Sequence, residues 1–311
     1  MAQYLVTGAA GFIGSHLVDA LLANGHRVRG LDNFSSGRAE NVDPRCEMLR
    51  ADAADPAAMR AAMEGAAGCF HLAAVASVAR TNEDWLGTHR SNQTAAVNAF
   101  DSARGCGQVP VVYASSAAVY GDVGRRVAHE GLMPTPLTAY GADKMGCELH
   151  GGAAWRVHGV PTLGLRFFNV YGPRQASDSP YTGVISIFAR ALRERRPVTL
   201  HGDGRQVRDF VHVDDVVAHL ISAMERSHAR PDAAVVNVCT GRGVSLLELV
   251  ECLGLVLGRA ARVMHGPARA GDIRQSVGNP HAAQTLLGLA ARVRLEDGLA
   301  ALLGAKAAVA A

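Results

Sequence analysis

The sequence has 311 residues, enough for two structural units at about 150 residues per domain. Hydrophobic residues make up 49% and charged residues 19% of the chain, a globular composition that excludes a disordered protein. The net charge of +3 is small and the basic residues are dispersed, which argues against a nucleic-acid partner. No apolar run is long enough to span a bilayer, and the six cysteines and 13 histidines form no metal-ligand pattern. We therefore expect a cytoplasmic protein with neither a membrane segment nor a metal site.

Short apolar runs alternate with longer segments rich in alanine and leucine through the first half of the chain. Strands are predicted at Tyr4–Thr7, Arg27–Leu31, Glu47–Arg50, Gly68–His71, Val109–Ala114 and Thr162–Arg166. Helices are predicted at Phe12–Asn24, Pro56–Glu64, Thr88–Arg104 and Ala139–His158. This alternation is typical of a parallel sheet with helices on both faces, so we predict a doubly wound, Rossmann-like α/β fold.

The composition changes to glycine, proline, serine and aspartate around Tyr171–Tyr181, which marks a boundary or a binding loop. Beyond it, helices are predicted at Gly183–Arg196, Asp214–Glu225 and Ser245–Leu257, and strands at Val198–His201 and Ala234–Cys239. We expect residues 1–172 to form the Rossmann domain and residues 173–311 to form mainly a smaller C-terminal α/β lobe for the substrate. The chain is expected to return to the first domain around residues 208–240.

Three glycines follow the first predicted strand and open the first predicted helix, in the segment Gly8-Ala-Ala-Gly11-Phe-Ile-Gly14. In this context glycine permits a tight turn, close approach to a pyrophosphate and close helix–strand packing, and the helix N-terminus favours an anion. Asp32 ends the second strand at about the 20-residue offset where a carboxylate binds the adenosine ribose. A carboxylate there repels a 2′-phosphate, so NAD is favoured over NADP. Glycine turns are also common without a ligand, and Asp32 alone could simply form a turn.

Tyr140 and Lys144 lie four residues apart at the start of a predicted helix, so they share one face. Tyrosine is a poor base at neutral pH unless a cation stabilises its phenolate form, which Lys144 and an oxidised nicotinamide would do. Ser116 ends the preceding strand, where side chains face the ligand crevice of an open α/β sheet. It can therefore share a hydrogen bond with a reacting oxygen. Taken separately, the pair could be surface neighbours and Ser116 a turn cap.

The motifs Thr-Gly-x-x-Gly-x-x-Gly, Ser-Ser-x-x-Val-Tyr-Gly and Tyr-x-x-x-Lys, in this order, resemble those of the extended short-chain dehydrogenase/reductase family. Within that family they are most similar to the UDP-glucose (UDP-hexose) 4-epimerase group. Later segments that also resemble this group are Leu165–Arg174, His201–Phe210 and Gly271–Arg274. The resemblance covers nearly the whole chain. One departure is Ala76, where many epimerases carry a lysine near the cofactor.

The resemblance implies a set of cofactor contacts. Gly8, Gly11, Phe12, Ile13 and Gly14 would contact the pyrophosphate; Asp32, Asn33, Phe34, Ser35, Ser36 and Gly37 the adenosine ribose; Asp52 and Ala53 the adenine; Leu72, Ala73, Ala74 and Ser91 the far side of the cofactor; and Phe168, Tyr140 and Lys144 the nicotinamide end. For the UDP-sugar substrate, it implies Ser116 at the sugar, Asn169 at the sugar diphosphate, Arg208 and Arg269 at the phosphates, Asp272 at the uridine ribose, Thr199 and His201 near the uracil, and Ser276 at the sugar substituent. It also implies a homodimer built on the helices Thr88–Arg104 and Ala139–His158.

The residues after the active-site serine or threonine separate the reactions of this family. Sugar-nucleotide dehydratases usually carry Asp-Glu there, whereas this chain has Ala117-Ala118, which disfavours elimination. We hypothesise that Tyr140 takes the proton of the sugar 4-hydroxyl while the C4 hydride passes to NAD. The 4-keto sugar would then turn over in the pocket, and the hydride would return to its opposite face.

UDP-galactose and UDP-glucose are the first choice of substrate. The small Ser276 also leaves the N-acetyl sugars UDP-GalNAc and UDP-GlcNAc open. UDP-glucuronate is open as well, and Arg174 and Arg205 could be either partners of its carboxylate or solvated loop residues. Two alternatives to the epimerase remain. One is another NAD-dependent sugar-nucleotide reductase or dehydratase, and the other is a nucleotide-sensing Rossmann protein without turnover.

Overall fold

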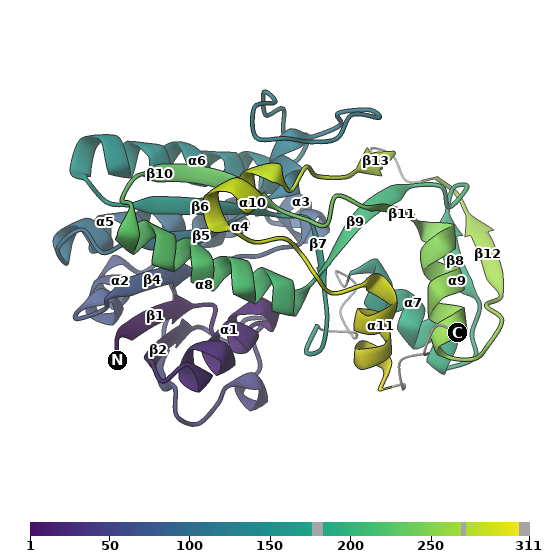
Figure 1. Ribbon diagram of the computed structural model, residues 1–311, viewed down its shortest axis with the longest axis horizontal. Helices are drawn as coiled ribbons and strands as arrows, with labels where there is room; N and C mark the ends of the chain where they lie inside the picture. The colour runs from purple at the N-terminus through teal and green to yellow at the C-terminus, as the bar shows by residue number, and fades with distance from the viewer. Residues whose placement is uncertain (176–182, 269–271, 305–311) are drawn as a thin grey trace.

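The computed structural model of the chain describes residues 1–175, 183–268 and 272–304, without the side chains of Val78 and Ala79 (Figure 1). Its main sheet has seven strands in the order β10-β6-β5-β4-β1-β2-β3, all parallel. The strands are β1 (Gln3–Thr7), β2 (Arg27–Asp32), β3 (Glu47–Arg50), β4 (Gly68–His71), β5 (Val111–Ser116), β6 (Thr162–Phe167) and β10 (Ala233–Val238). The predicted Rossmann-like fold is confirmed.

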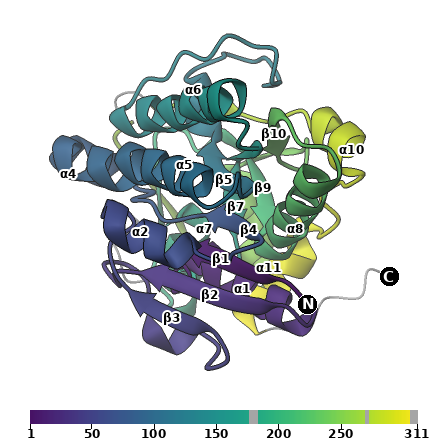
Figure 2. The ribbon, with the colours of Figure 1, turned by 90° about the vertical axis from the view of Figure 1, so that its left-hand side faces the viewer.

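Helices cover both faces of this sheet (Figure 2). One face carries α2 (Pro56–Met63), α5 (Ala95–Gly105) and α6 (Ala139–His158), and the other carries α1 (Phe12–Ala23) and α8 (Val213–Ala229), with α10 (His281–Leu287) beside α8. Successive side chains of a strand point to opposite faces, so Leu5 packs under α2 and α5 while Val6 packs under α1. Both are fully buried, which explains why the strands read as continuous apolar runs.

The helix predicted at Thr88–Arg104 begins earlier and contains an irregular turn. After α3 (Val78–Glu83), α4 (Trp85–His89) continues through a π-helical turn, η2 (Arg90–Thr94), into α5. The backbone stays right-handed helical at both junctions. The π turn holds the buried Asn92, whose Oδ1 accepts a 2.7 Å hydrogen bond from the backbone N–H of Val75. A wide turn of this kind inserts one residue into a helix and often marks a functional site.

A second group of elements lies at the far end of the sheet (Figure 1). It contains α7 (Val184–Arg193), β8 (Val198–His201), β9 (Val207–His212), β11 (Gly243–Ser245), α9 (Leu246–Val256), β12 (Val263–Gly266), β13 (Gln275–Ser276) and α11 (Leu295–Leu303). Its core includes Phe188, Leu200 and Leu249. Strand β9 was not predicted, yet it pairs with β7 (Asn169–Tyr171), β11 and β13.

The chain crosses between the two groups of elements, because β10 follows β9 and α8 and pairs with β6 at the edge of the main sheet. Short 3-10 turns, η1 (Ala39–Asn41) and η3 (Ala117–Tyr120), follow β2 and β5. Throughout the described ranges, every helix is too short or too polar to cross a membrane.

Candidate active site at the carboxyl edge of the sheet

The three predicted glycines form a tight loop between β1 and α1. Gly8 has a φ of +70°, which glycine adopts without strain. A Cβ on Gly14 would lie 2.0 Å from the carbonyl oxygen of Gly8, and one on Gly8 would lie 2.9 Å from the backbone nitrogen of Ala73. The backbone is therefore too closely packed at Gly8 and Gly14 to admit a side chain, and Phe12 and Ile13 stand between them in the first turn of α1. Such a loop fits a bound pyrophosphate.

Asp32 ends β2 directly beside this loop. Its Oδ2 accepts a 3.0 Å hydrogen bond from the N–H of Ala10, and its Oδ1 accepts a 2.7 Å bond from the N–H of Phe34. Gly37 also packs against the glycine loop, because a Cβ on Gly37 would be 2.8 Å from the Cβ of Ala10. Asn33, Ser35 and Ser36 complete the turn between them. The predicted ribose segment is thus folded over the glycine loop.

The segment after β4 is held against the end of β1. The hydroxyl oxygen of Thr7 accepts hydrogen bonds from the backbone N–H groups of Leu72 (3.1 Å) and Ala73 (3.2 Å), and it lies 2.9 Å from Nδ1 of His71. Burial, with a smaller effect from the positive charge of Lys144, lowers the pKa of His71 to about 3. His71 is therefore neutral at physiological pH and shares a hydrogen bond with Thr7.

Other predicted cofactor residues lie on neighbouring segments. Asp52, after β3, accepts a 2.9 Å bond from the N–H of Ala54, and Ala53 is buried. Ala74 follows in the segment after β4. Ser91 belongs to the π turn, but its hydroxyl donates a 3.2 Å bond to the carbonyl oxygen of Gly87 in the same helix. The next residue, Asn92, is the one bonded to the segment after β4.

The predicted catalytic residues come from β5 and the first turns of α6. Nζ of Lys144 donates a 2.8 Å hydrogen bond to the carbonyl oxygen of Ala114 and lies 5.9 Å from the centre of the Tyr140 ring. The hydroxyl oxygen of Ser116 accepts a 3.1 Å bond from the N–H of Ala118. A Cβ on Gly141 would be 2.6 Å from the carbonyl oxygen of Ala118. The helix start that carries Tyr140 and Lys144 therefore packs against the strand end that carries Ser116.

Strand β9 brings the predicted substrate residues together. Asn169, at the start of β7, lies opposite Phe210 of β9, and Ser276 of β13 lies opposite Arg208. Phe168 precedes Asn169; it is buried, and its ring centre is 6.4 Å from that of Tyr120. Residues from three separate parts of the sequence thus meet along one short strand.

Arg208 and Asp272 form an ion pair of 2.6 Å. Burial lowers the pKa of the Arg208 guanidinium, and the neighbouring Asp272 carboxylate opposes this shift. Nε2 of Gln206 donates both to Asp272 (3.1 Å) and to the carbonyl oxygen of His201 (2.7 Å), so Gln206 joins the predicted ribose and uracil residues. Thr199 is exposed on β8. The predicted phosphate ligand Arg269 lies outside the described residues.

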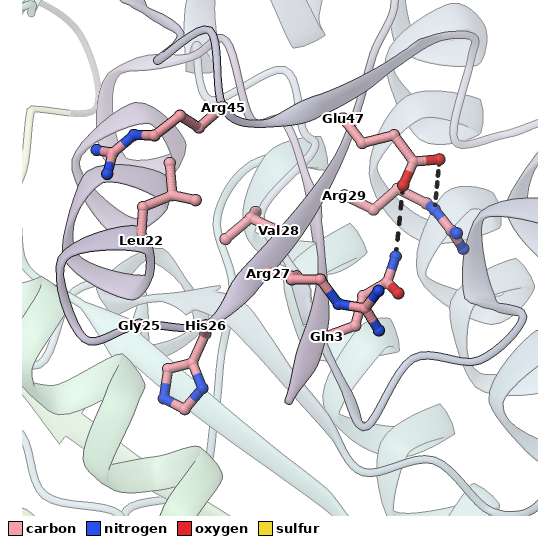
Figure 3. Close-up of a pocket in the computed structure, with 9 residues that line it drawn as sticks. All are labelled: Gln3, Leu22, Gly25, His26, Arg27, Val28, Arg29, Arg45 and Glu47. Carbon is pink, nitrogen blue, oxygen red and sulfur yellow. Dashed lines mark hydrogen bonds and ion pairs between the residues drawn. The ribbon is translucent and has the colours of Figure 1, made fainter. Parts of the chain in front are cut away.

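A separate groove of about 470 Å³ lies at the opposite edge of the sheet, where β1, β2 and β3 begin (Figure 3). Its lining contains none of the predicted site residues. Arg29 and Gln3 both donate to the carboxylate of Glu47 in this groove, and Arg45 pairs with Asp43. Open α/β sheets bind their ligands at the carboxyl ends of the strands, so the groove is not part of the candidate active site.

Comparison with known proteins agrees with this geometry. The model of the NAD dependent epimerase/dehydratase family matches residues 4–239. The chain belongs to this family. The UDP-glucose 4-epimerase of Mycolicibacterium smegmatis is 36% identical over 304 residues, which cover 95% of this chain and 96% of that protein.

Two solved structures extend the comparison. One is a UDP-glucose 4-epimerase of Thermotoga maritima with UDP-glucose (34% identity, TM-score 0.92, 97% of each chain). The other is a UDP-glucuronic acid 4-epimerase of Bacillus cereus with UDP-glucuronic acid and NAD (28% identity, TM-score 0.89, 97% of this chain and 98% of that one). For this member of the NAD-dependent epimerase/dehydratase family, the predicted resemblance, the epimerase class of enzyme and NAD as cofactor are confirmed.

Three groups that contact the predicted site segments were missed in the sequence. These are the pair Thr7 and His71, Asn92, and Gln206. A partial signal for two of them lies in the sequence. Gln206 lies inside a segment that resembles the family, and Asn92 directly follows the predicted contact residue Ser91. Their burial and their bonds to distant backbone groups are the signals that single residues in a sequence do not carry.

Proposed function

We propose that the chain interconverts UDP-galactose and UDP-glucose by inverting the sugar at C4 through a 4-keto sugar. The observation that carries the proposal is the packing of the Tyr140–Lys144 turn against the end of β5, with Ser116 there and the glycine loop after β1, two strands away at the same edge of the sheet. This set supplies one base, one cation and one hydroxyl. It supplies no carboxylate at positions 117 and 118, where an elimination would need one.

In this proposal Tyr140 accepts the proton of the sugar 4-hydroxyl and later returns it. Lys144 stabilises the phenolate, and its bond to the Ala114 carbonyl fixes where the ammonium group lies. Ser116 shares a hydrogen bond with the sugar O4. Bound NAD supplies the reversible hydride acceptor. Asp32 and the glycine loop would hold the ribose and pyrophosphate of that cofactor.

The same proposal assigns the substrate nucleotide to the second group of elements. Arg208 would bind the diphosphate, with Asn169 beside it, and Asp272 the uridine ribose. UDP-galactose and UDP-glucose are the substrates to assay first, and UDP-glucuronate comes after them. Of the two arginines considered for the uronate, Arg174 pairs at 2.7 Å with Asp19. The small Ser276 keeps UDP-GalNAc and UDP-GlcNAc as second substrates to assay.

The two alternatives make different demands. A reductase would consume reduced cofactor with each turnover, whereas an epimerase regenerates it. A sensor would have no use for the Tyr140–Lys144 pair.

We also propose that residues 1–172 act as the cofactor domain, that the protein works in the cytoplasm, and that it forms a homodimer through α4–α5 and α6. The exposed Trp85, Leu149 and Val157 on these helices support the dimer.

The deciding experiment follows the anomeric protons of UDP-galactose by NMR, without added reductant or cofactor and then with added NAD. Conversion to UDP-glucose is expected, and Tyr140→Phe should abolish it while the protein keeps its thermal midpoint. If UDP-galactose is unchanged, the N-acetyl and uronic acid analogues follow. If folded protein that contains NAD converts none of these UDP-sugars, the epimerase proposal is overturned.

A further inference from the structure

A buried ion pair lies directly behind the candidate catalytic residues. Arg166 of β6 binds Glu148 of α6 through two hydrogen bonds, from Nε (2.8 Å) and from one terminal nitrogen (2.7 Å). Each side chain is 6% exposed. The other terminal nitrogen of Arg166 is buried and has no hydrogen-bond partner among the described residues. Both charges of the pair therefore lie in the core.

Such a pair is not explained by stability. Removing two charges from water costs more than a hydrophobic pair of similar volume would, and buried ion pairs replaced by apolar residues often leave a protein equally stable. A contribution to the geometry of the site would account for the presence of the pair.

The ion pair contacts both elements that carry the candidate catalytic residues, β5 and α6. Oε1 of Glu148 accepts a 2.5 Å hydrogen bond from the hydroxyl of Ser115, the neighbour of Ser116 on β5. Glu148 is also one helical turn beyond Lys144 on α6. One carboxylate therefore ties the strand end that carries Ser116 to the helix that carries Tyr140 and Lys144.

Arg166 extends the same connection to the nicotinamide end of the site. Its guanidinium lies 4.7 Å from the centre of the Tyr120 ring. The Tyr120 hydroxyl donates a 2.7 Å bond to Oδ1 of Asn237, and the Tyr120 ring neighbours Phe168. The pair is thus the junction of a continuous buried network from β5 and α6 to Phe168.

We propose that Ser115, Glu148 and Arg166 are positioning residues that set the distance between Ser116 and Tyr140 during hydride transfer. This inference rests on the proposed function of those two residues. The three do not touch the substrate. They act by holding β5 and α6 in one register, which a strong, bidentate and directional contact does better than apolar packing.

The first test replaces the pair with Glu148→Met/Arg166→Met, a change that removes both buried charges together. The thermal midpoint and the NAD content are expected to match the wild type, KM to stay nearly constant, and kcat to fall by about 10- to 100-fold, the loss that a displacement of about 1 Å can cause. Deuterium at C4 of the sugar is the second readout. The kinetic isotope effect on kcat should rise, because hydride transfer becomes slower relative to product release. A purely structural defect lowers the active fraction and leaves that isotope effect unchanged.

Two further variants keep the inference testable if the double variant does not fold. Ser115→Ala removes only the hydroxyl between β5 and Glu148 and should lower kcat by roughly fivefold, equivalent to one hydrogen bond, again with a larger isotope effect. Arg226→Met/Asp232→Met is the matched control, since it removes a bidentate pair of 2.5 and 2.7 Å at the other edge of the sheet. Its kcat and isotope effect should equal those of the wild type.

Wild-type kcat and isotope effect in Ser115→Ala, or in a folded pair variant, would overturn the inference while leaving the proposed function intact. A wild-type protein that turns over none of the UDP-sugars would instead overturn the proposed function, and the positioning role with it.

Discussion

Arg208 and Asp272 are joined by a 2.6 Å hydrogen bond that links β9 to the residues before β13. The two residues were assigned to different parts of the substrate, one to the diphosphate and one to the ribose. Their contact means that neither side chain is placed independently of the other.

Asp272→Asn is therefore expected to weaken UDP binding by about 10- to 100-fold, because it also loosens Arg208. Arg208→Met should have a similar effect, and the double variant should lose less than the product of the two single losses. Isothermal titration with UDP measures all three. The exposed neighbouring pair, Arg274 and Asp203, is the control, and Arg274→Met should change the affinity by less than about threefold. Fully independent losses in the double variant would contradict the coupling.

Gly14→Ala should disable the cofactor loop. The new Cβ would lie 2.0 Å from the Gly8 carbonyl oxygen, so the loop must open, and the free energy of unfolding should fall by about 1–3 kcal/mol. NAD measured in the supernatant of denatured protein should fall with it. Gly105→Ala, at the end of α5 with no atom closer than 3.9 Å, should keep the wild-type stability and NAD content. A normal NAD content in Gly14→Ala would show that the cofactor is held elsewhere.

His71 predicts how stability depends on pH. Burial first and the Lys144 charge second lower its pKa to about 3 in the folded protein, whereas an unfolded histidine titrates near 6.5. Between these values the unfolded state binds the extra proton, so the free energy of unfolding falls as the pH drops below about 6.5, by up to about 1.4 kcal/mol per pH unit. His71→Asn, which can still bond to Thr7, should flatten this dependence.

Urea unfolding at about pH 5 and about pH 7.5 checks this expectation. The difference between the two midpoints should shrink in His71→Asn and stay unchanged in His228→Asn, since His228 is exposed on α8. An equal difference in all three proteins would assign the pH dependence to other groups.

The proposed dimer predicts the effect of charges on α6. Leu149 and Val157 are 59% and 70% exposed and lie two turns apart on one side of the helix. Leu149→Glu/Val157→Glu should convert the dimer to a monomer in light scattering coupled to size exclusion. Leu255→Glu, on α9 and 81% exposed in the wild type, should not. A wild-type monomer at micromolar concentration would refute the dimer.

The first half of the fold could be predicted because its central strands β1, β4 and β5 are mostly buried and read as short, largely apolar runs between helical segments. Strand β9 could not be predicted in this way. It contains Asp209, an acidic residue that is fully buried in the structure. Its carboxylate accepts hydrogen bonds from the N–H groups of Thr240 (2.8 Å) and Gly241 (2.9 Å). Partners some 30 residues away in sequence make such a strand stable, and a local pattern does not contain them.

The site shows the same limit at Ser91 and Asn92. Regular helical spacing gives no reason to prefer one over the other. The π turn shifts the residues that face the end of β4, and it directs Asn92 to Val75 while Ser91 bonds within its own helix. The proposed cofactor contact of Ser91 remains a prediction.

Because of this turn, the effect of deleting one residue depends on where in the helix the deletion falls. Deleting one residue within Arg90–Thr94 would restore regular α-helical winding and leave Ala95, Ala99 and Ala103 against the sheet, at the cost of rotating Asn92 by about 100°. Deleting one residue within α5 would rotate one end of the alanine face out of the core. Homologues that differ in length here are therefore expected to differ at the turn, and those with the shorter helix are expected to hold Val75 by another group.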